Sequence, residues 1–128
     1  MSKQKLLPLA SLACCSPLVA APVREDEAAQ LAHLFKALAD PVRLRLLSLI
    51  GAHKGGRDPG AGVCVCDLTG AFEVTAPTIS HHLKVLREAG LIASQRRGTW
   101  VYYWIVPGVL ERLADVFTSQ PAAAANAQ

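Results

Sequence analysis

Residues 75–105 read TAPTISHHLKVLREAGLIASQRRGTWVYYWI, and this stretch decides the fold. Thr75 is a good helix N-cap, and Gly90 supplies the left-handed residue with which helices often end. The pattern therefore predicts a helix over residues 76–89. At 100° per residue, one face of this helix is apolar and we expect it to be buried; it carries Ile79, Leu83 and Leu86.

The opposite face of the same helix is polar and is our first candidate site. Of the two adjacent histidines, His82 lies beside the apolar stripe, so His81 is expected to be the exposed one. Helix-turn-helix proteins place the N-terminal part of such a helix in the major groove of DNA, where small hydroxyls suit phosphates and base edges. We therefore predict DNA contacts from Pro77, Thr78, Ser80, His81 and Lys84.

A β-hairpin is predicted directly after this helix. The β-rich runs 92–96 and 100–105 flank Arg97-Gly98-Thr99, a good hairpin turn. The tip carries a cationic group suited to the phosphate backbone or a narrow minor groove, formed by Arg96, Arg97 and Gly98. A surface hairpin after an amphipathic helix is the plainer interpretation, but a capped helix followed by a basic wing favours DNA binding.

The residues before this stretch predict further helices. Asp40 followed by Pro41 is a strong helix start, and the apolar spacing predicts helices over residues 25–38 and 41–52. Residues 53–62 hold four of the nine glycines and form a loop. A short helix is expected over residues 65–71 and a last one over 108–117. The fold class is mainly α with a β-hairpin wing, a winged helix-turn-helix.

Length and composition fit one small domain. At 128 residues the chain suits a single core, and its net charge of +3 permits nucleic-acid binding without requiring it. We expect a flexible arm over residues 1–23, the winged domain over 24–118 and a disordered tail over 119–128. Because no Cys–His catalytic pairing, phosphate loop or cofactor motif is present in the sequence, we predict that the protein is not an enzyme.

Three motifs resemble one known family. LFKALADPVRLR at residues 34–45, CVCDL at 64–68, and TISHHLKVL at 78–86 with AGL after it occur in the order seen in the ArsR/SmtB family of bacterial metal- and metalloid-responsive repressors. The resemblance covers about residues 28–117. It implies a homodimer formed by the first and last helices. It also implies binding to double-stranded DNA at an inverted-repeat operator, with release when an inducer binds.

All four cysteines of the chain lie in two close pairs, and thiolates select soft ions. In the family resemblance, Cys64 and Cys66 match a sensing motif at the start of the helix before the recognition helix. One type of arsenic sensor has a third cysteine where this chain has Thr69, so another thiol must come from elsewhere. Cys14 and Cys15 resemble arm cysteines of two other branches, which sense cadmium and lead or arsenic.

The inducing ion is predicted from the geometry of these thiols. Residues i and i+2 of a helix point about 200° apart, so Cys64 and Cys66 converge only if Cys64 precedes the helix. Cys66 is then expected in the first turn, where the helix dipole lowers a thiol pKa. Adjacent Cys14 and Cys15 suit the open pyramidal site of As(III) or Sb(III) better than a tetrahedral site. We favour these ions over Cd(II) or Pb(II) as inducers.

Other interpretations of the cysteines stay open. The thiols can act as a redox sensor by forming a disulfide, or they can pack as small apolar side chains. The apolar run 6–21 after two lysines resembles a signal peptide, but Pro8 and Pro17 interrupt it. No segment is long enough to span a membrane. We therefore expect a cytoplasmic protein with free thiols rather than an exported ion carrier.

The family has a second kind of metal site, and we expect it to be absent here. That site uses carboxylates and histidines on the last helix. The last helix of this chain has Glu111 and Asp115 but no histidine.

Overall fold

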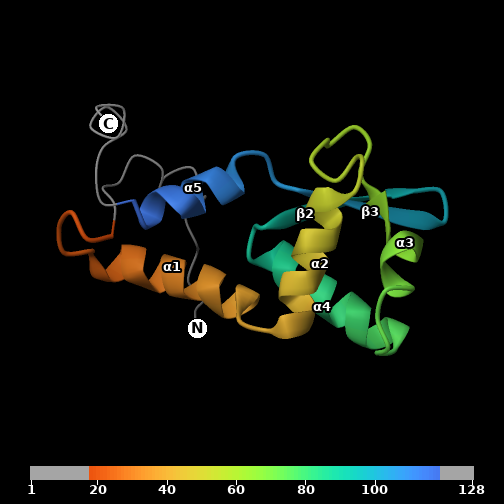
Figure 1. Ribbon diagram of the computed structural model, residues 1–128, viewed down its shortest axis with the longest axis horizontal. Coiled ribbons are helices and arrows are strands. Elements are labelled where there is room, and N and C mark those ends of the chain that lie inside the picture. Colours follow the sequence, from red (N-terminus) through yellow and green to blue (C-terminus); the bar gives the residue numbers. More distant parts are fainter. Residues whose placement is uncertain (1–17, 119–128) are drawn as a thin grey trace. The chain divides into compact units, whose positions relative to one another are not determined.

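The computed structural model describes residues 18–118. The described residues belong to two compact units (Figure 1). One joins the residues up to Ala32 with those from Gly108, and the other is His33–Pro107. The predicted tail over residues 119–128 and residues 1–17 of the predicted arm lie outside the described part. Within residues 18–118, no helix has both the length and the apolar character that a membrane span requires.

Helix α1, Glu25–Leu38, belongs partly to each unit. The smaller unit also holds α5, Val109–Val116, where the Leu18 amide donates to the Val116 carbonyl at 2.7 Å. The larger unit contains the remaining elements, which follow in chain order: α2 Pro41–Ala52, β1 Val63–Cys64, α3 Val65–Thr69, α4 Ala76–Glu88, β2 Ile92–Arg97 and β3 Trp100–Ile105.

The three described strands form an antiparallel sheet in the order β1-β3-β2. Helix α2 contacts both β3 and α4, and α4 also packs on β2. The core between these elements consists of apolar side chains that are fully buried: Leu46, Ile50, Leu68, Ile79, Leu83, Leu86, Leu91 and Ile92. The predicted winged helix-turn-helix is confirmed, including the apolar face of α4.

Helix ends follow the predicted caps. The Asp40 carboxylate accepts hydrogen bonds from the amides of Val42 at 2.9 Å and Arg43 at 3.1 Å. The Thr75 hydroxyl accepts from the Thr78 amide at 3.4 Å. Gly90 follows α4 with φ +88, a conformation that a residue with a Cβ atom rarely adopts. These ends fix where α2 and α4 begin and where α4 stops.

The structure corrects two details of the prediction. The short helix α3 ends at Thr69 rather than at residue 71. Val63 and Cys64 form a strand, β1, that local pattern did not predict, because its partners Tyr103 and Tyr102 are about forty residues away in the chain. The predicted loop over residues 53–62 therefore leads into the sheet.

Leu83→Ala tests this core. Leu83 is fully buried in α4, so we expect its truncation to lower the free energy of unfolding by about 2–5 kcal/mol. Chemical denaturation followed by circular dichroism measures the change. The exposed neighbour Lys84→Ala is the control and should change stability by less than about 0.5 kcal/mol. Equal midpoints for Leu83→Ala and wild type would contradict the assigned core.

Candidate nucleic-acid interface and thiol pair

The predicted DNA-reading residues of α4 all lie on its solvent side. Pro77, Thr78, Ser80, His81 and Lys84 are exposed, whereas Ile79 and Leu83 between them are fully buried. The apolar stripe therefore turns the polar face outward as the sequence predicted. The N-terminal turn of α4 also carries the partial positive charge of the helix dipole, which suits anionic partners.

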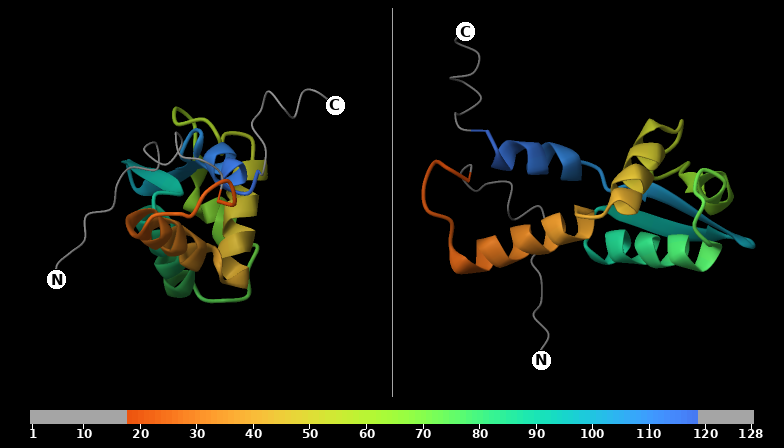
Figure 2. Two further views of the ribbon diagram at one scale, coloured as in Figure 1. Left: turned by 90° about the vertical axis from the view of Figure 1, so that its left-hand side faces the viewer. Right: turned by 60° about the horizontal axis from the view of Figure 1, so that its bottom comes forward.

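The wing tip and the N-terminal end of α4 lie on the same side of the larger unit. In two views, the N-terminal end of α4 and the tip of the β2–β3 hairpin point to the same side of the larger unit (Figures 1 and 2). Gly98 at the tip has φ +68, which favours glycine. Arg96 is exposed and its Nε atom donates to the Gly98 carbonyl at 3.2 Å. This arrangement presents a cation at the hairpin tip, on the same side of the larger unit as the N-terminal end of α4.

Arg97 has a different environment from Arg96. Its guanidinium lies over the Tyr102 ring, 4.7 Å from the ring centroid. It also donates to the carbonyls of Ala61 and Pro59, the latter at 3.3 Å, and to the Gln95 side chain at 3.0 Å. Arg97 is thus turned back onto the loop before β1, and a contact with DNA phosphate competes with these hydrogen bonds.

His82 joins α4 to the start of α2, a role that the sequence did not predict. Its Nδ1 atom lies 3.1 Å from an Arg43 nitrogen, and its Nε2 atom lies 3.9 Å from an Asp40 carboxylate oxygen. Since arginine only donates, Nδ1 accepts and Nε2 carries the proton toward Asp40. Arg43 also donates to the Ala37 carbonyl at 2.6 Å. The only signal in the sequence was the position of His82 beside the buried stripe.

The same contacts lower the pKa of Asp40. The Arg43 amide hydrogen bond is the largest cause that holds this pKa below its ordinary value of 3.8, followed by the Val42 amide. The positive charge of Arg43, and that of His82 when its ring is protonated, act in the same direction, and partial desolvation of the carboxyl opposes them. The carboxylate is therefore both the cap of α2 and the anion that faces His82.

Cys64 and Cys66 bring their sulfur atoms together. Cys64 is buried at the end of β1 and is the N-cap of α3, and the exposed Cys66 lies in the first turn. The two sulfurs are 2.6 Å apart, longer than the about 2.05 Å of a disulfide bond, and both are free thiols. The predicted geometry is thus observed: Cys64 precedes the helix, and the pair converges.

The predicted lowering of the Cys66 pKa is wrong. Its pKa is raised above the ordinary 9.0, chiefly because the hydrogen bond to the Cys64 sulfur stabilises the protonated thiol. Partial desolvation and the charges of Cys64 and Asp67 raise it further, and the Cys66 amide opposes them weakly. Two thiols in contact cannot both ionise cheaply, and this outweighs the dipole of a five-residue helix.

The arm cysteines, Cys14 and Cys15, lie outside the described residues. Within residues 18–118, no three side chains of histidine, cysteine, aspartate or glutamate gather into a group that could hold a metal ion. Cys64 and Cys66 are therefore observed as a pair of donors.

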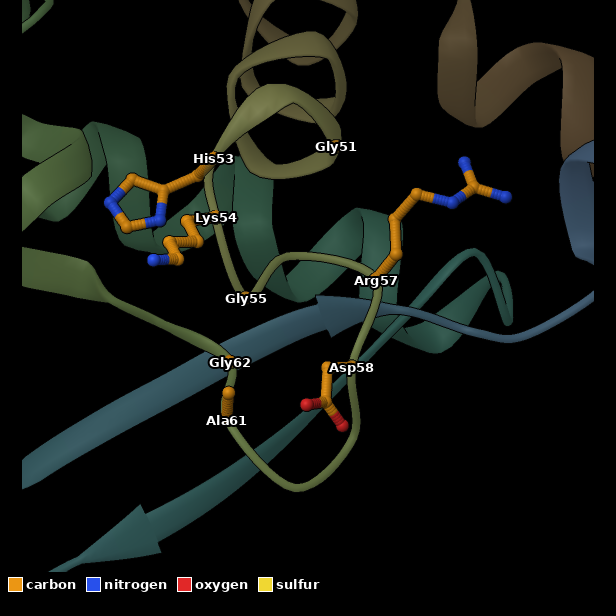
Figure 3. Close-up of a pocket in the computed structure, with 8 residues that line it drawn as sticks. All are labelled: Gly51, His53, Lys54, Gly55, Arg57, Asp58, Ala61 and Gly62. Atoms are coloured by element: carbon orange, nitrogen blue, oxygen red, sulfur yellow. The ribbon is translucent and has the colours of Figure 1, made fainter.

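The loop before β1 has an open depression of about 670 Å³ on its surface (Figure 3). His53 and Lys54 project from one side of the loop and Arg57 points away from them (Figure 3). His53 lies 3.8 Å from the Asp67 carboxylate in α3. Because its cationic side chains diverge, the depression does not form a single anion site.

Comparison with known proteins identifies the family. The model of the bacterial regulatory protein, arsR family, matches residues 61–94, which contain the thiol pair and all of α4. A solved structure from Mycobacterium bovis, described as a homodimeric winged helix-turn-helix DNA-binding domain of a possible ArsR-family regulator, is 30% identical with a TM-score of 0.56. The two match over 73% of this chain and 82% of that chain. This chain belongs to the ArsR family.

Two curated relatives match part of this chain. An arsenic resistance transcriptional regulator, ArsR1 of Pseudomonas putida, is 47% identical over 76 residues, which are 59% of this chain and 54% of that protein. A transcriptional repressor SmtB homolog of Synechocystis is 42% identical over 78 residues, 61% and 53% of the two chains. The chain thus spans about half the length of these two relatives.

Asp40→Ala tests the link between α2 and α4. We expect a melting temperature several degrees lower at neutral pH, because two amides lose their acceptor. The folded-state pKa is lowered, so this stabilisation is present above pH 3.8 and is lost as the pH falls through the lowered pKa. Melting curves of both proteins from neutral to acidic pH measure it. Asp115→Ala, which removes an exposed carboxylate, is the control. A wild-type advantage that stays constant down to the lowest pH would contradict this role.

Proposed function

We propose that this protein is a homodimeric transcriptional repressor that binds double-stranded operator DNA and leaves it when As(III) or Sb(III) binds cysteine thiolates. The observation that carries the proposal is that the N-terminal end of α4, whose polar residues are exposed, and the hairpin tip lie on one side of the larger unit (Figures 1 and 2). The thiol pair lies at the start of α3, the element immediately before α4.

DNA binding is supported by the chemistry of the exposed residues. Thr78 and Ser80 offer short hydroxyls to phosphates and base edges, and Lys84 and Arg96 offer cations that displace condensed counterions from DNA. A single α4 covers a short half-site, so an inverted repeat needs two copies. We assign dimerisation to α1 and α5, and the Mycobacterium bovis relative is described as homodimeric.

Ion binding is supported by the two converging sulfurs. Trivalent arsenic prefers soft sulfur donors in an open pyramid of three, and Cys64 and Cys66 supply two of them. We assign the third to Cys14 or Cys15 of the arm, within the chain or from the second copy. Arsenous acid replaces its hydroxyl groups by these thiols, forming one As–S bond and one water at each step.

Release of DNA follows from the connection between α3 and α4. Arg45 of α2 lies over the Phe72 ring at 4.8 Å and donates to the Ala71 carbonyl at 3.4 Å, so the segment between α3 and α4 is tied to α2. A shift of α3 toward the bound ion therefore strains the seating of α4. Useful derepression needs a coupling free energy of about 1–3 kcal/mol between the ion and DNA.

Two other inducers have specific support. The SmtB homolog among the relatives favours a metal-responsive repressor, for which Cd(II) or Pb(II) is the inducer. The short distance between the two sulfurs favours a thiol redox sensor, in which Cys64 and Cys66 lose two electrons and two protons to an oxidant such as peroxide and form a disulfide. In each case we expect the protein to act in the cytoplasm on the same operator.

An anisotropy titration tests the switch. Labelled operator DNA in a reducing buffer should be released by sodium arsenite, with operator affinity falling at least about fivefold. Cys64→Ser and Cys66→Ser should abolish the response, and Cys14→Ser with Cys15→Ser together should weaken it. Cd(II), Pb(II) and peroxide, the last without reductant, are parallel arms. Wild-type protein that keeps its operator in every arm would refute the proposed switch.

The dependence of ion affinity on pH separates the inducers. Cd(II) and Pb(II) displace thiol protons, so their affinity should rise with pH, the more so because the Cys66 pKa is raised. Arsenite releases water instead of protons, so its affinity should be nearly flat between about pH 6 and 8. Calorimetry in buffers of different ionisation enthalpy counts the protons. Proton release on arsenite binding would contradict the condensation with thiols.

A further inference from the structure

The sheet places Cys64 beside the wing. Cys64 pairs with Tyr102 on β3, and Tyr102 pairs on its other side with Gln95 of β2. Paired residues of antiparallel strands project to the same face, and so do residues two apart in one strand. The thiol of Cys64, the ring of Tyr102 and the side chain of Arg97 therefore lie on one face of the sheet, in that order.

Arg97 closes this row onto the chain before Cys64. Its guanidinium covers the Tyr102 ring and binds the carbonyls of Pro59 and Ala61. Ala61 is three residues before Cys64. The segment 59–64 is thus attached to the wing at both ends, by Arg97 at its start and by strand pairing at its end.

The same segment fits tightly against β3. Gly62 has φ +77, and a Cβ atom there would lie 3.0 Å from Tyr102 Cβ and 3.4 Å from Trp104. The Ile105 amide donates to the Gly56 carbonyl at 2.8 Å, and the Gly62 amide donates to the Gly55 carbonyl at 3.0 Å. Close packing leaves little room to absorb a displacement of Cys64 locally, so it passes on to the neighbouring strands.

We infer that Arg97 is a positioning residue that couples the Cys64 segment to the wing, rather than a direct phosphate contact. The inference rests on the proposed function, in which an ion binds Cys64. When the ion draws Cys64 toward further thiols, the segment 59–64 moves. Either the hydrogen bonds between Arg97 and this segment break, or they hold and the wing moves with the segment. The ion then affects the wing as well as α4.

The chemistry of Arg97 supports this assignment. A side chain that stacks on a ring while it donates to two carbonyls needs the flat guanidinium of arginine, whose donors lie in one plane. The ammonium group of lysine also donates, but it is not planar and cannot stack in this way. Arg96, one residue earlier, is exposed and donates to a carbonyl of the hairpin tip itself. The two adjacent arginines therefore have separate tasks: Arg96 faces the solvent at the tip, and Arg97 holds the wing to the loop.

The decisive experiment compares Arg97→Lys with Arg96→Lys, since both retain the charge. Operator affinity is measured for each full-length protein without ion and with saturating sodium arsenite, and the ratio of the two affinities is the coupling factor. Arg97→Lys should lower this factor at least about threefold, while Arg96→Lys should leave it unchanged. Tyr102→Leu, which removes the ring, should lower the coupling factor as Arg97→Lys does. The double variant should lower the coupling factor no further than either single variant.

A second measurement observes the wing without DNA. The chain has two tryptophans, and Trp100 is the half-exposed partner of Arg97 at the end of the hairpin. In a Trp104→Phe protein the fluorescence therefore reports on the wing. Arsenite should change the Trp100 emission, and Arg97→Lys should suppress that change while the number of arsenic atoms bound per chain stays the same.

Several results would overturn the inference. One is an Arg97→Lys protein with the wild-type coupling factor and Trp100 response. Another is an Arg97→Gln protein whose salt dependence of DNA binding falls by about one phosphate contact while its coupling factor is unchanged, which marks a direct contact. Loss of arsenite binding in Arg97→Lys would place Arg97 in the ion site instead.

The wild-type protein separates failure of the inference from failure of the proposed function. If wild type itself keeps its operator, the proposed function fails and the inference fails with it. If wild type responds and Arg97→Lys responds equally, the inference alone fails.

Discussion

Burial of one apolar stripe on α4 is the constraint on which the rest of the larger unit depends. Ile79, Leu83 and Leu86 are fully removed from solvent, and each buried side chain of this size stabilises the fold by roughly 1.5–3 kcal/mol. With a period of 3.6 residues, burying them fixes the rotation of the helix and therefore which polar groups face outward. The His82 contacts with α2 then set the helix against the Asp40 cap. The exposed face of α4 is thus a consequence of its core.

The closeness of the two thiols assembles a pair of donors but makes the Cys66 thiol harder to ionise. A strand that ends at the residue where a helix begins brings two side chains together that a regular helix would point apart. The same closeness raises the Cys66 pKa, because the hydrogen bond from the Cys66 thiol to the Cys64 sulfur stabilises the protonated form of Cys66. A preformed pair of this kind favours a partner that can take protonated thiols, and it makes divalent cations compete with protons for the same sulfurs.

Local signals in the sequence predicted most of the helices, the caps and the hairpin. Asp40, Thr75 and Gly90 act within a few residues of their own position, so their roles could be read without a structure. Strand β1 could not, because two residues have no periodicity and their partners lie far along the chain. The environment of Arg97 depends on that strand and on the loop before it, so its hydrogen bonds to the Pro59 and Ala61 carbonyls could not be predicted from the sequence. The direction of the Cys66 pKa shift could not be predicted from the sequence. The effect of the helix dipole follows from local position alone, whereas the hydrogen bond to Cys64 that raises this pKa depends on the folded geometry.

The proposed switch has two routes from Cys64 to the groups that we assign to DNA binding, and the interactions along the second have the free energy that such a switch requires. The first runs along the chain through α3 to α4, and the second crosses the sheet from β1 through Tyr102 to Arg97. A hydrogen bond from a charged donor is worth about 1.5–3 kcal/mol, and a cation over an aromatic ring about 0.5–1 kcal/mol at an exposed site. A useful coupling between ion and operator needs about 1–3 kcal/mol. In the proposed coupling, the interactions of Arg97 together supply a free energy of this size, and no rearrangement of the core is required. Arg97 lies at the partly exposed edge of the wing, where a hydrogen bond can break without the cost of opening a packed interior.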